Sequence, residues 1–203
     1  MQMAVLWTRP IDHALTCLEA AARSARETGE MVYACYTRQH RLTDLVARGD
    51  PLDEIWRESV AALDFVRKYK FGQVVVLSIQ DFVQSLRGQA NRVDGAALEA
   101  RVLRSGVAVV ACFHWILQLQ RQFLVGDPDM LWCSPGRRNH FFGSARLNIQ
   151  SVDCCLYHSL ALAAVIPTAS PERQAELREA LTENLHSLER WAASCPEITS
   201  IHW

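Results

Sequence analysis

Cysteine and histidine at helical spacing are the residues of this 203-residue chain best suited to metal chemistry. Cys154 and His158 lie four positions apart, so on a helix a thiolate and an imidazole would face one ion. Cys133 or His140 would have to complete the site. No H-E-x-x-H or C-x-x-C motif occurs, and cysteine is among the most buried residue types. We therefore predict no metal site and place Cys154 in the core.

Polar residues inside apolar stretches form a second group of candidates. His114 precedes Trp115 in the most apolar segment, where a buried, hydrogen-bonded structural histidine is favoured over a catalytic base. Gln80 and Asp81 interrupt another apolar stretch. A solvated helix face is favoured there over the lining of a pocket. Trp56 joins these residues as a candidate for the wall of a pocket or an interface.

Phosphate-binding and nucleophile motifs are missing from the sequence. Neither G-x-x-x-x-G-K-[ST] nor G-x-G-x-x-G occurs, and there is no G-x-S-x-G elbow. Arg137 and Arg138, followed by aromatic residues, could contact phosphates or a protein, but a solvated turn is favoured. The net charge of -1 gives no electrostatic reason for binding nucleic acid. We predict a protein that is not an enzyme and needs no cofactor.

The predicted location is the cytoplasm, without a membrane span. The first ten residues lack a basic leader and end in Pro10, unlike a signal peptide. The longest apolar run, 107–119, is too short and too polar to cross a bilayer. Seven cysteines without repeated spacing are typical of free thiols in a reducing compartment.

Glycines punctuate the first half of the chain at intervals that fit helices. Gly29, Gly49, Gly72 and Gly88 each follow a stretch with apolar residues at helical spacing, which predicts helix C-caps. Asp50 is predicted to be an N-cap, with proline at the first position of the next helix. Segment 73–86 is rich in β-branched residues, but its length and neighbours favour a buried helix.

The second half is less regular. We predict a short helix over 96–104 and the most buried helix over 107–125. Segment 126–150 is predicted to be irregular. A helix resumes by Val152 and ends near Ile166, and Ser170 with Pro171 opens the last one. The predicted fold is a single all-α domain over 1–203, whose antiparallel helical hairpins stack as a tetratricopeptide-like α-solenoid with a pair period of roughly 40 residues.

Several strings along the chain resemble, in the same order, a helical-repeat region of large bacterial signalling proteins. Those proteins join a serine/threonine-kinase-like domain, a P-loop ATPase-like domain and a sensor histidine kinase. The similar strings are Trp7 to Ile11, Glu27 to Tyr36, Gly49 to Leu52, Phe65 to Lys68, Phe123 to Asp127, Leu131 to Pro135, Tyr157-His158 and Trp191 to Glu197. The resemblance implies an all-helical, non-catalytic connector between the ATPase-like and kinase parts. The chain departs from the family in having about one helix less after Asp127 and in segment 137–149.

The leading functional hypothesis is a module of bacterial signal transduction that binds a protein partner, an adjoining kinase-like or ATPase-like domain, or a second copy of itself. Apolar residues near both ends, such as Leu6 and Ile201, support association. The alternative is a helical domain that senses a small apolar molecule near Trp56, Val76, His114 and Trp115. An enzyme built around Cys154, His158 and His114 is the least favoured hypothesis.

Overall fold

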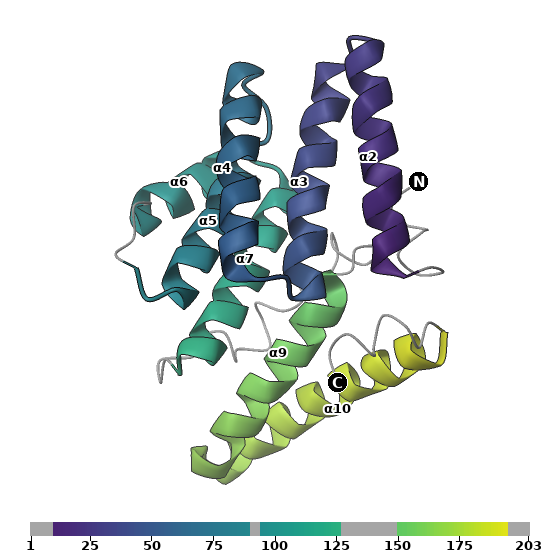
Figure 1. Ribbon diagram of the computed structural model, residues 1–203. Coiled ribbons are helices and arrows are strands. Elements are labelled where there is room, and N and C mark those ends of the chain that lie inside the picture. Colours follow the sequence, from purple (N-terminus) through teal and green to yellow (C-terminus); the bar gives the residue numbers. More distant parts are fainter. Residues whose placement is uncertain (1–9, 90–93, 127–149, 195–203) are drawn as a thin grey trace.

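The computed structural model describes residues 10–89, 94–126 and 150–194, and all regular structure within them is helical. This confirms the all-α class (Figure 1). The elements in chain order are α2 (Ile11–Glu27), α3 (Met31–Arg48), α4 (Leu52–Lys68), α5 (Gln73–Leu86), α6 (Gly95–Arg104), α7 (Ala108–Val125), α9 (Gln150–Val165), the 3-10 turn η2 (Ile166–Thr168) and α10 (Pro171–Ser194). The apolar chain ends named above lie outside the described residues.

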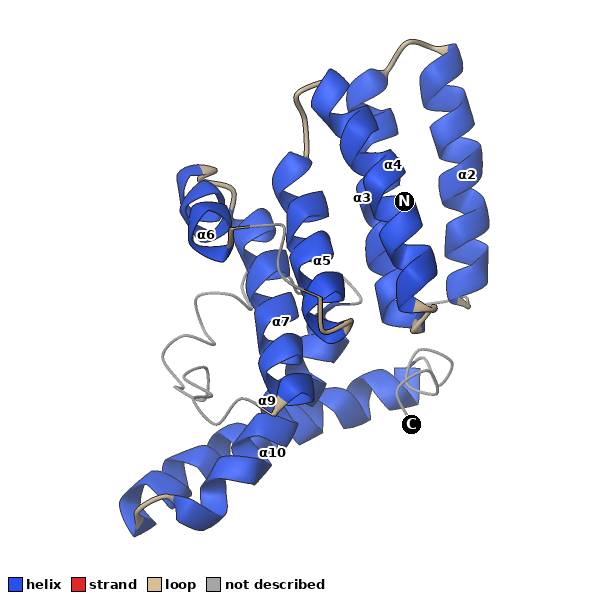
Figure 2. Ribbon diagram, turned by 60° about the vertical axis from the view of Figure 1, so that its left-hand side comes forward, coloured by secondary structure: helices blue, strands red, loops and turns tan. Residues whose placement is uncertain are grey.

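The first four helices form an antiparallel array, because the connections between them are too short for a crossover (Figure 1). Helices α9 and α10 form a separate hairpin, which contacts the rest of the protein mainly through α9 on α7. Figure 2 shows this hairpin extending away from the body made by α2 to α7.

Helices α5 and α7, which α6 separates along the chain, run in the same direction. Ser78 contacts His114, and three residues further on Asp81 contacts Gln118, so the contacts advance together along both helices. The short helix α6 is the return segment that makes this possible, and it packs on α5 and α7. Parallel neighbours require such a crossover, because a tight turn only joins antiparallel ones.

The helix ends follow the glycines with one exception. Gly49 closes α3 in the left-handed conformation, with φ of 77°, and Gly29 and Gly88 lie just past the ends of α2 and α5. Gly72 was predicted to close the preceding helix, and this is wrong. Lys70 takes the left-handed position after α4, with φ of 54°, while Gly72 precedes α5 with φ of 75°. The chain thus places two left-handed residues in one turn.

Helix starts also agree in part with the prediction. The hydroxyl of Ser170 accepts from the backbone N–H of Arg173 at 3.4 Å, and Pro171 is the first residue of α10. Asp50 does not cap α4, because its carboxylate is bound by Arg48 and Pro51 occupies the cap position. The Asp50-Pro51 pair therefore located the start of α4 correctly, but the Asp50 carboxylate binds Arg48 and not the helix N-terminus.

The main core lies between α3, α4 and α5, and α5 is its most buried helix. Ten of the fourteen residues of α5 are buried, against eight of the eighteen in α7. The prediction that 107–125 would be the most buried helix is therefore wrong. Helix α5 is enclosed by α3, α4, α6 and α7, whereas the last turn of α7 exposes Leu124 and Val125. A second core cluster joins α9, α10 and Leu119 of α7.

One described segment, Gln150–Thr168, is long and apolar enough to cross a membrane by length and composition. It packs on α7 along one side and on α10 along another, and it buries Asp153 and His158. These are properties of a core helix in a packed bundle.

Candidate docking groove

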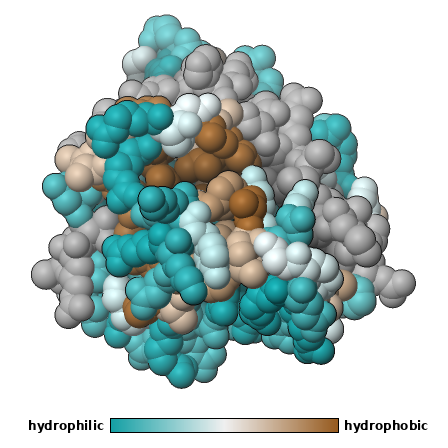
Figure 3. Space-filling view, turned by 90° about the horizontal axis from the view of Figure 1, so that it is seen from above, coloured by the Kyte–Doolittle hydropathy of each residue, from teal (hydrophilic) through white to brown (hydrophobic). Residues whose placement is uncertain are grey.

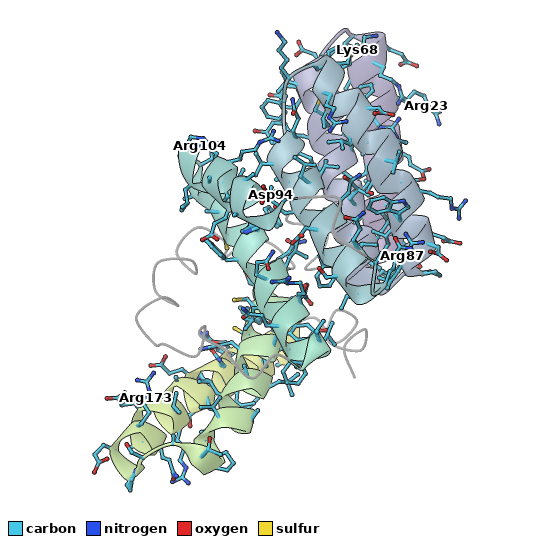
Figure 4. The ribbon with its side chains drawn as sticks, turned by 90° about the vertical axis from the view of Figure 1, so that its left-hand side faces the viewer. Arg23, Lys68, Arg87, Asp94, Arg104 and Arg173 are labelled. Carbon is cyan, nitrogen blue, oxygen red and sulfur yellow. The ribbon has the colours of Figure 1, made fainter. Side chains whose placement is uncertain are left out.

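An open groove of about 680 Å³ lies where the α3–α4 turn, the ends of α5 and α7 and the first half of α9 meet. We call it the apolar groove. Its polar lining residues are Arg48, Asp50, Gln120 and Asp153, and its apolar ones are Val46, Ala47, Pro51, Leu52, Ile55, Phe82, Leu86, Leu124, Leu156 and Tyr157. Arg87, labelled in Figure 4 at the lower edge of the body, marks the end of α5 beside it. Four parts of the chain that are distant in sequence thus build one concave surface.

The rim of the apolar groove is more exposed than its floor. Ile55 and Phe82 are buried, whereas Leu124 is 50% exposed and Val125, next to it, is 61% exposed. Covering the exposed half of a leucine side chain is worth about 1 kcal/mol at the usual transfer value per unit of apolar area. An apolar side chain of a second molecule would therefore gain free energy by seating against Leu124.

Arg48 braces one wall of the apolar groove. Its Nε and Nη2 donate to the two carboxylate oxygens of Asp50, at 2.6 Å each, and its Nη1 donates to Asp12 of α2. The hydrogen bonds and charges of these carboxylates raise the pKa of Arg48, so the guanidinium is always charged. A bidentate arginine pair fixes orientation as well as distance. The α3–α4 turn and the start of α2 are thereby held together.

Polar side chains line the contacts of α5 with its neighbours inside the body. Gln80 donates to Ser59 of α4 at 3.2 Å, and Asp81 accepts from the Gln118 amide at 3.0 Å. Gln80 and Asp81 are 5% and 2% exposed, so the prediction of a solvated helix face is wrong. The sequence shows a polar pair on an apolar helix, but it does not show that α4 and α7 cover both sides.

His114 is a buried, hydrogen-bonded histidine, as predicted. Its Nδ1 lies 3.0 Å from the Ser78 hydroxyl, which itself donates to the Val74 carbonyl at 2.9 Å. A hydroxyl has one proton, so Ser78 accepts from Nδ1–H, and Nδ1 is not a base for this serine. Burial, and secondarily the charge of Arg121, lower the pKa of His114 to about 4 against the opposing charge of Asp81. A Ser78–His114 nucleophile pair is therefore absent.

Cys154 and His158 take different partners. The Asn184 amide lies 2.9 Å from His158 Nδ1, which accepts the hydrogen bond, and the ring is buried. Cys154 packs instead near Cys112 and Ile116 of α7. Burial raises the pKa of Cys112 to about 11, which keeps this thiol protonated. Among the described residues no three His, Cys, Asp or Glu side chains are placed to hold a metal ion.

The remaining candidates are spread over the molecule. Trp56 lies on α4, and the guanidinium carbon of Arg87 is 5.8 Å from the centroid of the Trp56 ring. Trp115 contacts the ring of His114. Neither tryptophan lines the apolar groove. Arg137 and Arg138, like Cys133 and His140, lie outside the described residues.

Sequence reasoning missed the apolar groove, although a signal was present. Leu124 and Val125 continue the apolar character of α7 into its last turn, immediately before Gly126. Exposed apolar side chains at the end of a helix point to a surface with a partner.

Comparisons with protein-family models, with curated proteins and with solved structures found no match to this chain.

Proposed function

We propose that the protein is a non-catalytic helical module that binds another protein by receiving an apolar helix in the apolar groove. The observation that carries the proposal is the combination of a concave apolar floor with the half-exposed Leu124 on its rim. Helix-in-groove recognition uses such surfaces, with anchors one or two turns apart on the bound helix. An open groove between helices favours an extended partner over an enclosed small molecule.

The finer architecture belongs to the same proposal. The α2–α3 and α4–α5 hairpins resemble repeating units, and the short α6 with α7 would make a third hairpin that brings α7 parallel to α5. Stacked helical hairpins of the tetratricopeptide-like kind present extended binding surfaces without a catalytic centre. The resemblance to bacterial signalling proteins makes an adjoining ATPase-like or kinase-like domain, in the cytoplasm, the partner that we propose.

A photo-crosslinking amino acid in place of Leu124 tests the proposal directly. Leu185 on α10, which is 45% exposed and does not line the groove, is the matched control position. We expect light-dependent transfer to a protein from position 124 and none from position 185, in cells that express the full chain. Mass spectrometry of the adduct identifies the partner.

The alternatives appear as distinct outcomes of the same experiment. An adduct with a second copy of this chain would show self-association in place of a separate partner. Equal labelling from both positions, or no protein adduct at all, would contradict the docking proposal. Recovery of a small molecule at position 124 would favour the sensing domain.

A further inference from the structure

A second groove, of about 320 Å³, runs between α2 and α3 and carries a different chemistry. We call it the arginine groove. Its base is made by Leu18, Ala22 and Thr37, and its charged lining residues are Glu19, Arg23, Arg26, Arg38, Arg41 and Glu58. Four arginines against two glutamates give it a local excess of two positive charges, on a chain whose net charge is -1.

Both glutamates form ion pairs with the same arginine. Arg41 donates to Glu19 at 2.9 Å and to Glu58 at 3.5 Å, so its charge is met within the protein. Arg23 and Arg26 are exposed, and no ion pair holds either of them within the described part of the chain. Their charges remain available to a ligand.

Arg38 is oriented without being neutralised. Its guanidinium carbon lies 5.4 Å from the centroid of the Phe65 ring, on α4. A guanidinium stacked on an aromatic face keeps its charge, and the N–H groups on its planar edge can still donate to a carboxylate in the bidentate geometry. Stacking also reduces the rotamer freedom that binding would otherwise remove.

The spacing of these arginines fits a ligand with several separated negative charges. Arg23 and Arg26 lie three positions apart on α2, which is about 4.5 Å along the helix axis, and Arg38 lies on the neighbouring helix. A single small anion would meet only part of this set, whereas the carboxylates of successive acidic side chains would meet all of it. Pairing of arginine forks with carboxylates is strong and directional.

We propose that the arginine groove binds an acidic, aspartate- or glutamate-rich segment of a protein partner. The inference rests on the proposed function in that it assigns the chemistry of a second contact to the same partner-binding module. The arginine groove lies on α2 and α3, on a different part of the body from Leu124. The two contacts can therefore be tested separately.

A titration with the purified full chain tests the proposal. The probe is a fluorescein-labelled peptide in which glutamates alternate with alanines, followed by fluorescence anisotropy at low salt. Reversing both charges, R23E with R26E, is expected to weaken its binding about tenfold or more. The matched control is R101E with R104E on α6, which has the same spacing and the same change in net charge. Figure 4 shows Arg104 and Arg23 on different sides of the body.

The control variant is expected to change the peptide affinity by less than about threefold. Binding of the peptide to the wild-type protein is expected to be lost as the salt concentration is raised. All four substituted positions are exposed, so thermal melts should coincide and exclude unfolding as the cause. An undetectable titration, equal loss in both charge reversals, or preference for an oligonucleotide or for inorganic phosphate would overturn the proposal. The peptide assay does not depend on Leu124, so its failure would leave the crosslinking result standing, and the reverse also holds.

Discussion

Substitution of Gly72 by alanine measures how tightly the α4–α5 turn is packed against α3. Gly72 has φ of 75°, and a Cβ at this position would lie 1.5 Å from Nε2 of Gln39. Gly49 is the matched control, because its φ is 77° and a Cβ there would meet nothing within 4 Å. Both variants therefore bear the same left-handed backbone strain, and only one bears a steric clash.

The magnitudes follow from these two contributions. Gly49→Ala should lower the free energy of unfolding by about 1 kcal/mol, from left-handed strain less the entropy removed from the unfolded chain. Gly72→Ala should lower it by about 2 kcal/mol, because the Gln39 side chain must also leave its rotamer to move its amide about 2 Å away from the new Cβ. Urea unfolding followed by circular dichroism measures both values.

A double substitution separates strain from clash. Gln39→Ala removes the obstructing amide, whose Nε2 has no hydrogen-bond partner among the described residues. The pair Gln39→Ala with Gly72→Ala should therefore show a favourable coupling of about 1 kcal/mol. Equal costs for the two single glycine variants, with no coupling to Gln39, would refute the reasoning.

Two further predictions concern the turn and the buried histidine. Lys70→Gly should raise the free energy of unfolding by about 1 kcal/mol, because glycine adopts the left-handed conformation without strain. Ala61→Gly, at an exposed position inside α4, should lower it by a similar amount in the same urea assay. The lowered pKa of His114, about 4 against an ordinary 6.5, means that the unfolded state binds more protons between these values. The contribution of neutral, buried His114 to the free energy of unfolding is therefore fully present above pH 6.5 and declines by about 3 kcal/mol as the pH falls to 4. His114→Gln, which cannot titrate, should flatten that part of the stability profile, and an unchanged profile would contradict the assignment.

Local signals in the sequence were sufficient for the helices and for most of their ends. Apolar residues at helical spacing, together with Gly49 and Pro171, located helices whose bounds agree with the structure to within a few residues. The segment 73–86 was also predicted to be a helix despite its β-branched residues. Its length and flanking helices decided that assignment, because strands are usually shorter.

The wrong predictions concern which element or side chain a residue contacts. Gly72 was assigned to the wrong helix because a glycine marks a turn without showing which side of the turn needs it. Asp50 was predicted to be an N-cap because it precedes Pro51, and the sequence does not show that Arg48, two residues earlier, binds its carboxylate. The exposed end of α7 is visible in the sequence, but the rest of the apolar groove is not, because its walls come from segments whose relative placement depends on the α6 crossover.

The buried polar contacts between α5 and α7 fix the register of these two helices. A purely apolar interface between α5 and α7 would tolerate a slide of one helical turn, about 5.4 Å, with little loss of contact area. Such a slide would separate Ser78 from His114 and Asp81 from Gln118 at once. Each buried group left without its partner would cost about 1–3 kcal/mol, and a buried carboxylate more. The register that these pairs fix is also the one that brings Leu86 and Leu124 to the same groove, so residues that could be mistaken for a catalytic cluster instead set the geometry of the binding surface.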